Sequence, residues 1–144
     1  MNNFLKGILL VLRYGPAKVN LWREGFIYDE LTGAYSRRFL TEVGEKEFVR
    51  SVRCEYSFSL ISIDVDKFKK INDEEGHFAG DKALKDVVSL LMKKCRESDM
   101  VFRTGGDEFL ILLPETSSED AENLIKRIKE ENLLTTKGKR IGLS

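Results

Sequence analysis

The sequence MVFRTGGDEFLILL, residues 100–113, decides the fold of this chain because two mostly apolar runs flank a polar turn. The runs Met100–Arg103 and Phe109–Leu113 are rich in residues that favour β-strands. Between them lie two glycines, which can take the positive φ that a tight hairpin needs. The stretch therefore predicts two antiparallel strands joined by a short turn.

A further strand and a helix are predicted upstream of this hairpin. The run FSLISIDV, residues 58–65, is mostly apolar, as expected of a central strand covered on both faces. Asp64 and Asp66 stand at its end, and a polar loop is expected around Gly76 and Gly80. Apolar residues then recur at helical spacing: Leu84, Val87, Val88, Leu91 and Cys95.

Two more helices and a last strand complete the expected elements. Ser36 can cap a helix whose apolar stripe is Phe39, Leu40, Val43, Phe48 and Val52. Thr116–Glu119 has the pattern of a capping box, and the helix after it has the inner face Ala121, Leu124, Ile125 and Ile128. A final strand is expected to begin at Arg140.

The predicted order is βαββαβ with one extra helix in front, which indicates an α+β fold of the ferredoxin-like or palm-like kind. The expected sheet has four antiparallel strands backed by helices. A crossover helix makes the first two strands point the same way. Asp64 and the turn at 105–108 should therefore meet at one rim of the sheet.

Length, composition and charge exclude several classes of protein. A chain of 144 residues with 42% hydrophobic residues fits one globular domain. Lys+Arg and Asp+Glu both number 24, so no overall charge favours nucleic acid or an anionic membrane as partner. The apolar run Gly7–Leu12 is too short to span a bilayer. Met1–Tyr28 is interpreted as an adaptor segment, and Cys54 and Cys95 fit a reducing cytoplasm.

Four acids form the candidate chemical site. Asp64, Asp66, Asp107 and Glu108 would supply oxygen ligands suited to Mg²⁺ or Mn²⁺. The pair Gly105–Gly106 has no side chains to block a nucleotide. On spacing alone, a hairpin that uses glycines and carries solvated acids is an equally good interpretation.

Three ordered blocks resemble one known family. FRTGGDEF at 102–109 contains the signature of GGDEF domains, and DVDKFKKINDEEGHFAGD at 64–81 is similar to the family pattern DxDxFKxINDxxGHxxGD. DELTGAYSRR at 29–38 resembles DxLTGLxNRR, with departures at Ala34 and Ser36. The resemblance is to the GGDEF family of diguanylate cyclases.

The resemblance covers residues 29–144 and implies an enzyme that condenses two GTP into cyclic di-GMP and two pyrophosphates with Mg²⁺. Each domain of the family holds one GTP, so a homodimer is implied. Family members continue through a strand and a final helix with basic residues for the GTP phosphates, which are expected to be missing after Ser144. That deficit keeps open the alternative of a non-catalytic module that binds GTP or cyclic di-GMP.

The family's functional residues transfer by position. The implied metal ligands are Asp64, the carbonyl of Val65, Asp107 and Glu108, and the implied catalytic residues are Asp107, as base, and Glu108. The implied substrate-binding residues are Phe68, Lys69, Asn72, His77, Asp81, Gly105 and Gly106. Among them, Asn72 and Asp81 match the positions that read the guanine edge, which an amide and a carboxylate suit. For His77, packing within a loop is an equally good interpretation.

A separate inhibitory product site is implied by the tetrad RESD at 96–99. Arg96 and Asp99 occupy the family's RxxD positions, and Arg103 is expected to assist them. A guanidinium suits phosphate or guanine, and a carboxylate suits a guanine edge. The alternative is a charged, solvated helix end.

Overall fold

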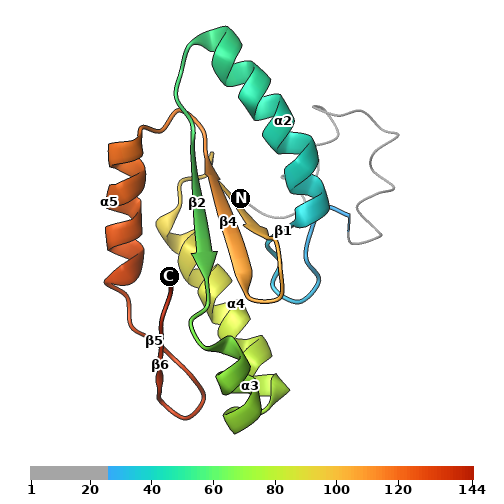
Figure 1. Cartoon of the computed structure of the whole chain (residues 1–144), viewed down its shortest axis with the longest axis vertical. Helices are drawn as coiled ribbons and strands as arrows, with labels where there is room; N and C mark the ends of the chain where they lie inside the picture. Colours follow the sequence, from blue (N-terminus) through green and yellow to red (C-terminus); the bar gives the residue numbers. More distant parts are fainter. Residues whose placement is uncertain (1–25) are drawn as a thin grey trace.

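A computed structural model describes residues 26–144. Most of the expected adaptor segment, residues 1–25, lies outside this part, whereas Ile27 is buried in the domain. The elements in chain order are β1 Tyr35–Ser36, α2 Arg37–Cys54, β2 Ser59–Asp64, α3 Phe68–Glu75, α4 His77–Lys94, β3 Met100–Arg103, β4 Glu108–Leu113, α5 Ser118–Lys129, β5 Leu133–Leu134 and β6 Arg140–Ile141 (Figure 1).

The main sheet has the strand order β1-β3-β4-β2. β4 pairs antiparallel with both β2 and β3, so β2 and β3 point the same way, as the crossover rule predicted. The prediction of a wholly antiparallel sheet is wrong at its edge, because the fourth strand is β1, which runs parallel to β3. The fold is nevertheless α+β with a mixed sheet, and the predicted hairpin of β3 and β4 is confirmed.

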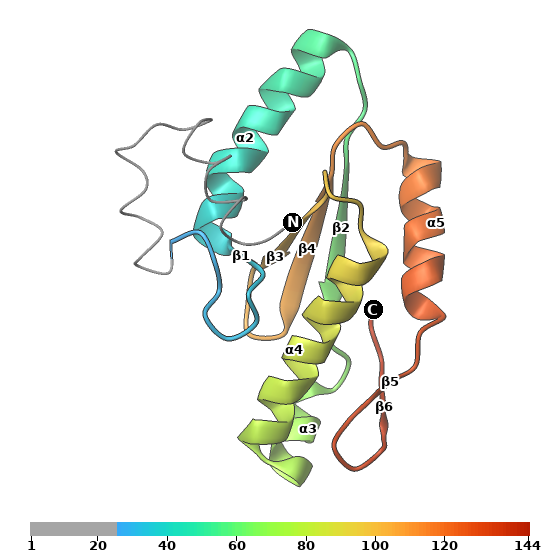
Figure 2. The same ribbon diagram turned by 180° about the vertical axis from the view of Figure 1, so that it is seen from behind.

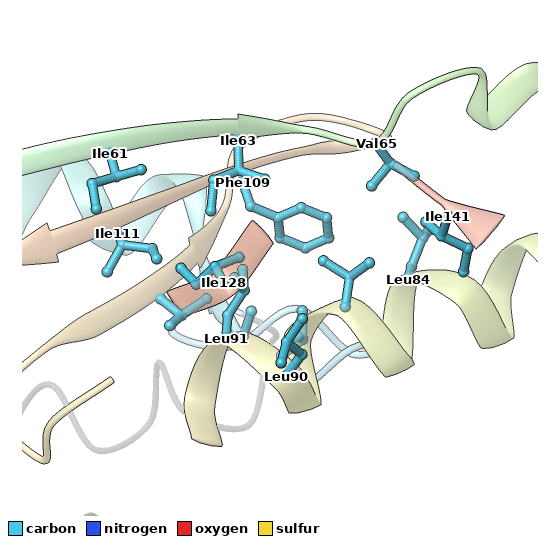
Figure 3. Close-up of a cluster of buried hydrophobic side chains, with 14 of the residues drawn as sticks. Ile61, Ile63, Val65, Leu84, Leu90, Leu91, Phe109, Ile111, Ile128 and Ile141 are labelled. Atoms are coloured by element: carbon cyan, nitrogen blue, oxygen red, sulfur yellow. The ribbon is translucent and has the colours of Figure 1, made fainter. Parts of the chain in front are cut away.

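The larger hydrophobic cluster lies between one face of the sheet and the helices α4 and α5 (Figures 1 and 2). Figure 3 shows Ile63, Phe109 and Ile111 of the strands facing Leu84 and Leu91 of α4. The predicted stripe of α4 is confirmed, since Leu84, Val87, Val88 and Leu91 are all buried.

The second cluster lies on the other face, under α2, and includes Phe39, Val43, Phe102 and Leu112. Ser36 caps α2 as predicted, because its Oγ accepts from the backbone N–H of Phe39 at 3.2 Å. The C-terminal part of the predicted stripe is wrong, because the side chains of Phe48 and Val52 are 58% and 64% exposed. The helix instead buries Glu47 and Ser51, since its inward positions recur every four residues. The Glu47 carboxylate accepts a hydrogen bond from the Tyr56 hydroxyl at 2.7 Å.

β2 is an edge strand and is covered on one face only, which corrects the prediction of a central strand. Ile61 and Ile63 are buried, whereas Leu60, Ser62 and Asp64 are exposed. The reason is that α2 packs over β1 and β3 and leaves this part of the sheet uncovered. The uncovered strip leads directly to Asp64.

Two local predictions fail because tertiary contacts override local pattern. The polar loop expected around Gly76 and Gly80 is reduced to Gly76, because α3 precedes it, with Ile71 packed into the larger cluster, and Gly80 lies in α4. α5 is capped by Ser117, whose Oγ accepts from the N–H of Asp120 at 3.2 Å. The expected cap, Thr116, is buried, and its hydroxyl donates to the Pro114 carbonyl.

We call residues 133–144 the strap. The strand expected to begin at Arg140 lies in it and pairs with two different segments. β5 and β6 pair with each other as a separate hairpin. The next residues pair with the end of β2: the N–H of Asp64 donates to the Ser144 carbonyl at 2.8 Å, and the N–H of Asp66 donates to the Gly142 carbonyl at 3.0 Å. Among residues 26–144, no helix is long and apolar enough to cross a bilayer.

Candidate active site

Two acids lie directly opposite each other at the end of the sheet. Asp64, the last residue of β2, is paired in register with Glu108, the first residue of β4. Both are exposed, on the face of β2 that α2 leaves uncovered. Like charges at directly paired positions destabilise a sheet. This juxtaposition therefore favours a function that uses a cation over a purely structural role.

The turn between β3 and β4 brings Asp107 to the same rim. The N–H of Val65 donates to the Asp107 carbonyl at 3.1 Å, which fixes the two acidic segments side by side. Contrary to prediction, neither turn glycine has a positive φ. At Gly105, a Cβ would lie 2.6 Å from Oε2 of Glu108, so a larger residue there would displace the Glu108 carboxylate.

Asp66 is directed toward the strap and away from any shared group of acids. The Ser144 hydroxyl donates to its Oδ1 at 2.6 Å, and a Cβ at Gly142 would lie 2.4 Å from its Oδ2. The predicted cluster of four acids is therefore divided between two neighbouring environments.

The oxygen atoms at this rim suit a bound Mg²⁺ by their chemistry. Among residues 26–144, no three His, Cys, Asp or Glu side chains are gathered into a group that could hold a metal ion. Mg²⁺ does not need such a group, because it keeps several waters and is commonly held by one or two carboxylates together with the phosphates of a substrate. Asp64, Asp107 and the Val65 carbonyl supply only hard oxygen donors, so the set fits that mode of binding.

Arg103 holds the turn between β3 and β4 by hydrogen bonds to its backbone, an arrangement that we call the brace. Its Nη2 and Nε donate to the Gly106 carbonyl at 2.7 and 3.3 Å, and Nε also donates to the Gly105 carbonyl at 3.2 Å. Its Nη1 donates to Oδ1 of Asp29 at 3.0 Å in an ion pair that is mostly shielded from solvent. The sequence interpretation missed this role, having assigned Arg103 only to the inhibitory site.

Asp29 connects this brace to a tight turn at residues 29–34. Its Oδ1 also accepts from the N–H and the hydroxyl of Thr32, at 2.9 and 2.6 Å. Burial opposes the charge of Asp29, but the hydrogen bonds from Thr32 and Arg103 hold its pKa below the ordinary value. The pattern Asp-x-x-Thr-Gly, typical of a turn closed by an Asp side chain, was the signal that could have revealed it.

α3 and α4 meet in an elbow that places Asn72 against Gly80, the residue before Asp81. Gly76, with φ +87°, ends α3 and precedes α4. A Cβ at Gly80 would lie 1.9 Å from Oδ1 of Asn72, so the amide side chain rests against the backbone of α4, one residue before Asp81. The two predicted guanine-reading residues therefore lie at the same elbow, Asn72 on α3 and Asp81 on α4.

The remaining predicted substrate-binding residues surround the elbow and the turn. Phe68 is half-buried, and its ring also approaches Gly80, since a Cβ there would lie 3.2 Å from its Cζ. Lys69, His77 and Gly106 are exposed. An exposed His77 on the first turn of α4 does not act as packing for the loop, which disfavours the structural interpretation.

The tetrad at 96–99 forms a turn after α4, apart from the acids of the rim. One oxygen of Asp99 accepts from the backbone N–H of Arg96 at 2.7 Å, and the N–H of Asp99 donates to the Arg96 carbonyl at 3.1 Å. The Arg96 side chain is exposed. Asp99 therefore has a structural role in addition to any role in binding.

Comparison with known proteins agrees with this geometry. Residues 26–139 match the family described as "Diguanylate cyclase, GGDEF domain". Diguanylate cyclase DgcP of Pseudomonas aeruginosa is 42% identical over 74% of this chain and 16% of its own length. Diguanylate cyclase DosC of Escherichia coli is 37% identical over 100% of this chain and 32% of its own length.

A solved structure shows the same fold. Diguanylate cyclase SiaD of Pseudomonas aeruginosa, in complex with its activator SiaC, superposes with a TM-score of 0.78 and 34% identity over 98% of this chain and 57% of SiaD. The chain thus spans about a sixth to a third of the curated relatives and just over half of SiaD. The family match over most of the chain, together with the signature hairpin and the paired acids, shows that this chain belongs to the GGDEF domain family of diguanylate cyclases.

Proposed function

We propose that this chain condenses two molecules of GTP into cyclic di-GMP, releasing two pyrophosphates, as one half of a homodimer in the cytoplasm. The observation that carries the proposal is the juxtaposition of Asp64 and Glu108 beside a turn without side chains at its glycines. This rim offers oxygen ligands for a metal ion and open space for phosphates. The elbow of α3 and α4 offers an amide and a carboxylate that can bind a nucleobase.

Each half-reaction is a phosphoryl transfer. The 3′-oxygen of one GTP attacks the α-phosphorus of the other, a new O–P bond forms, and the bond to pyrophosphate breaks. Asp107 takes the proton of the 3′-hydroxyl, and Asp64, Asp107 and the Val65 carbonyl, with Glu108 beside them, would hold Mg²⁺ or Mn²⁺. When bound, the ion neutralises charge that develops on the phosphates. A second domain must supply the other GTP, because each domain holds one.

The direct test is incubation of the chain with GTP and Mg²⁺, followed by chromatography of the nucleotides. Formation of cyclic di-GMP that requires both the ion and GTP supports the proposal. Binding of GTP without any product, in a sample shown to be dimeric, would instead establish the alternative of a non-catalytic binding module.

Selectivity for guanine should depend on the elbow. We expect Asn72→Ala and Asp81→Ala each to lower the preference for GTP over ATP by about tenfold or more, because a hydrogen bond to the guanine edge is lost. The measurement is competitive binding of the two nucleotides. Variants that discriminate as sharply as the parent would show that guanine is read elsewhere.

Product inhibition should depend on Arg96. Arg96→Ala is expected to weaken cyclic di-GMP binding by about tenfold, since a charge-assisted contact to phosphate or guanine is removed. GTP binding should stay unchanged because the elbow is untouched. Calorimetry with each nucleotide measures both. Asp99→Ala is the less diagnostic variant, because it also removes the acceptor that closes the turn at 96–99. Equal cyclic di-GMP affinity in parent and Arg96→Ala would mean that the tetrad is only a solvated turn.

A further inference from the structure

The carboxylate of Glu75, the last residue of α3, accepts three hydrogen bonds from the turn of the strap. The donors are the hydroxyls of Thr135 and Thr136, each at 2.8 Å, and the backbone N–H of Lys137 at 3.1 Å. Burial opposes its charge, but these donors hold the pKa of Glu75 below the ordinary value. Glu75 thus binds α3 to a turn about sixty residues away in sequence.

Glu74 adds weaker attachments to the same turn. The Lys137 ammonium donates to the Glu74 carbonyl at 2.7 Å, and Lys139 forms an ion pair with its carboxylate. Exposed ion pairs of this kind contribute little by themselves. The three bonds at Glu75 are more specific, because one is to a backbone N–H and another is to the buried Thr135. In Figure 1, α3 and the hairpin of β5 and β6 lie at the same end of the molecule.

The other end of the strap contacts residues 64–66, which include the proposed metal ligands Asp64 and Val65. Residues 142–144 pair with Asp64 and Asp66 through backbone hydrogen bonds, and Ser144 also binds the carboxylate of Asp66. One continuous segment therefore contacts both ends of residues 64–75. That stretch carries the proposed metal ligands at its start and Asn72 near its end.

α3 packs against α4, and the strap adds a second attachment at its C-terminal end. A helix of eight residues is marginal by itself. Its N-cap residue, Lys67, has φ +56° and makes no capping bond with its side chain, and Ile71 is its single buried residue. Small rotations of α3 would move Asn72 away from Gly80 and Asp81.

We propose that Glu75 is a positioning residue for guanine recognition, which it serves by fixing α3 to the strap so that Asn72 stays against Gly80 of α4. The inference rests on the proposed function, because it assumes that the elbow of α3 and α4 binds the guanine base of GTP. In this role Glu75 touches neither the nucleotide nor the metal. It acts through the orientation of Asn72.

The test compares GTP and ATP affinities of the parent, Glu75→Ala and Glu75→Gln by calorimetry. Glu75→Ala should lower GTP affinity about tenfold, through the loss of hydrogen bonds to a charged acceptor, and leave the weaker ATP affinity within about twofold. Glu75→Gln should lie between, because its amide keeps one acceptor oxygen for the strap. Glu122→Ala, which removes an exposed carboxylate from α5, is the matched control and should resemble the parent.

A double-mutant cycle with Asn72→Ala identifies the route of the effect. If Glu75 acts through Asn72, Glu75→Ala should change the GTP:ATP ratio by less than about twofold once Asn72 is already alanine. A ratio equal to the parent's in Glu75→Ala, or an equal loss of both nucleotides, overturns the positioning role and leaves the proposed function intact. A parent that does not prefer GTP to ATP overturns the proposed function, and this inference with it.

Discussion

Replacing Asp64 with asparagine should abolish GTP turnover and, at the same time, make the domain slightly more stable. Turnover should fall by about a thousandfold, because a metal ligand worth several kcal/mol in the transition state is lost. The free energy of unfolding should rise by about 0.5 kcal/mol, because Asp64 and Glu108 are like charges at directly paired positions. Steady-state kinetics and denaturant unfolding in the absence of metal measure the two effects.

Two companion variants separate the causes. Asp107→Asn should lose turnover to a similar extent without the gain in stability, since Asp107 lies in the turn outside the paired positions. Glu108→Gln should show the same gain in stability as Asp64→Asn. Unaltered turnover in Asp64→Asn would refute the metal assignment, and a loss of stability would refute the interpretation of the pair as repulsive.

Removal of the Arg103 side chain should destabilise the signature turn, because Arg103 holds the backbone of that turn by hydrogen bonds. Arg103→Ala leaves the carbonyls of Gly105 and Gly106 and the carboxylate of Asp29 without their shared donor. We expect a loss of about 2–3 kcal/mol in unfolding free energy, because the pair is largely shielded from solvent. Turnover should also fall. Arg127→Ala, at an exposed position of α5, is the control.

The brace also predicts a dependence on pH. The pKa of Asp29 is lower in the folded chain than its ordinary value of 3.8, so the ionised form stabilises the fold. That contribution is present above pH 3.8 and is lost as the pH falls through the folded pKa. The stability difference between parent and Asp29→Asn should therefore be largest near neutral pH and shrink below pH 3.8. A difference that stays constant down to the acid transition would contradict the role of the charge.

The sequence by itself determined the hairpin, the crossover helix and the neighbourhood of Asp64 and the signature turn. These follow from local pattern and from the handedness of the crossover, which depend on residues close in sequence. Through resemblance rather than through spacing, it also predicts that Asn72 and Asp81 belong to one site, which stays a prediction. Ser36 was predicted as a helix cap and is one, since capping needs only its own hydroxyl and a nearby N–H.

Tertiary structure alone decided the rest. α3 has too few apolar residues to be predicted as a helix, and its contacts with the strap come from residues about sixty positions away. The exposed face of β2 depends on where α2 packs, which the strand's own apolar run does not reveal. The pairing of Arg103 with Asp29 joins residues 74 positions apart, which local pattern does not reveal. The Arg103 guanidinium, which the sequence interpretation assigned to ligand binding, therefore holds the turn. Long-range packing selects among partners that local pattern leaves equivalent.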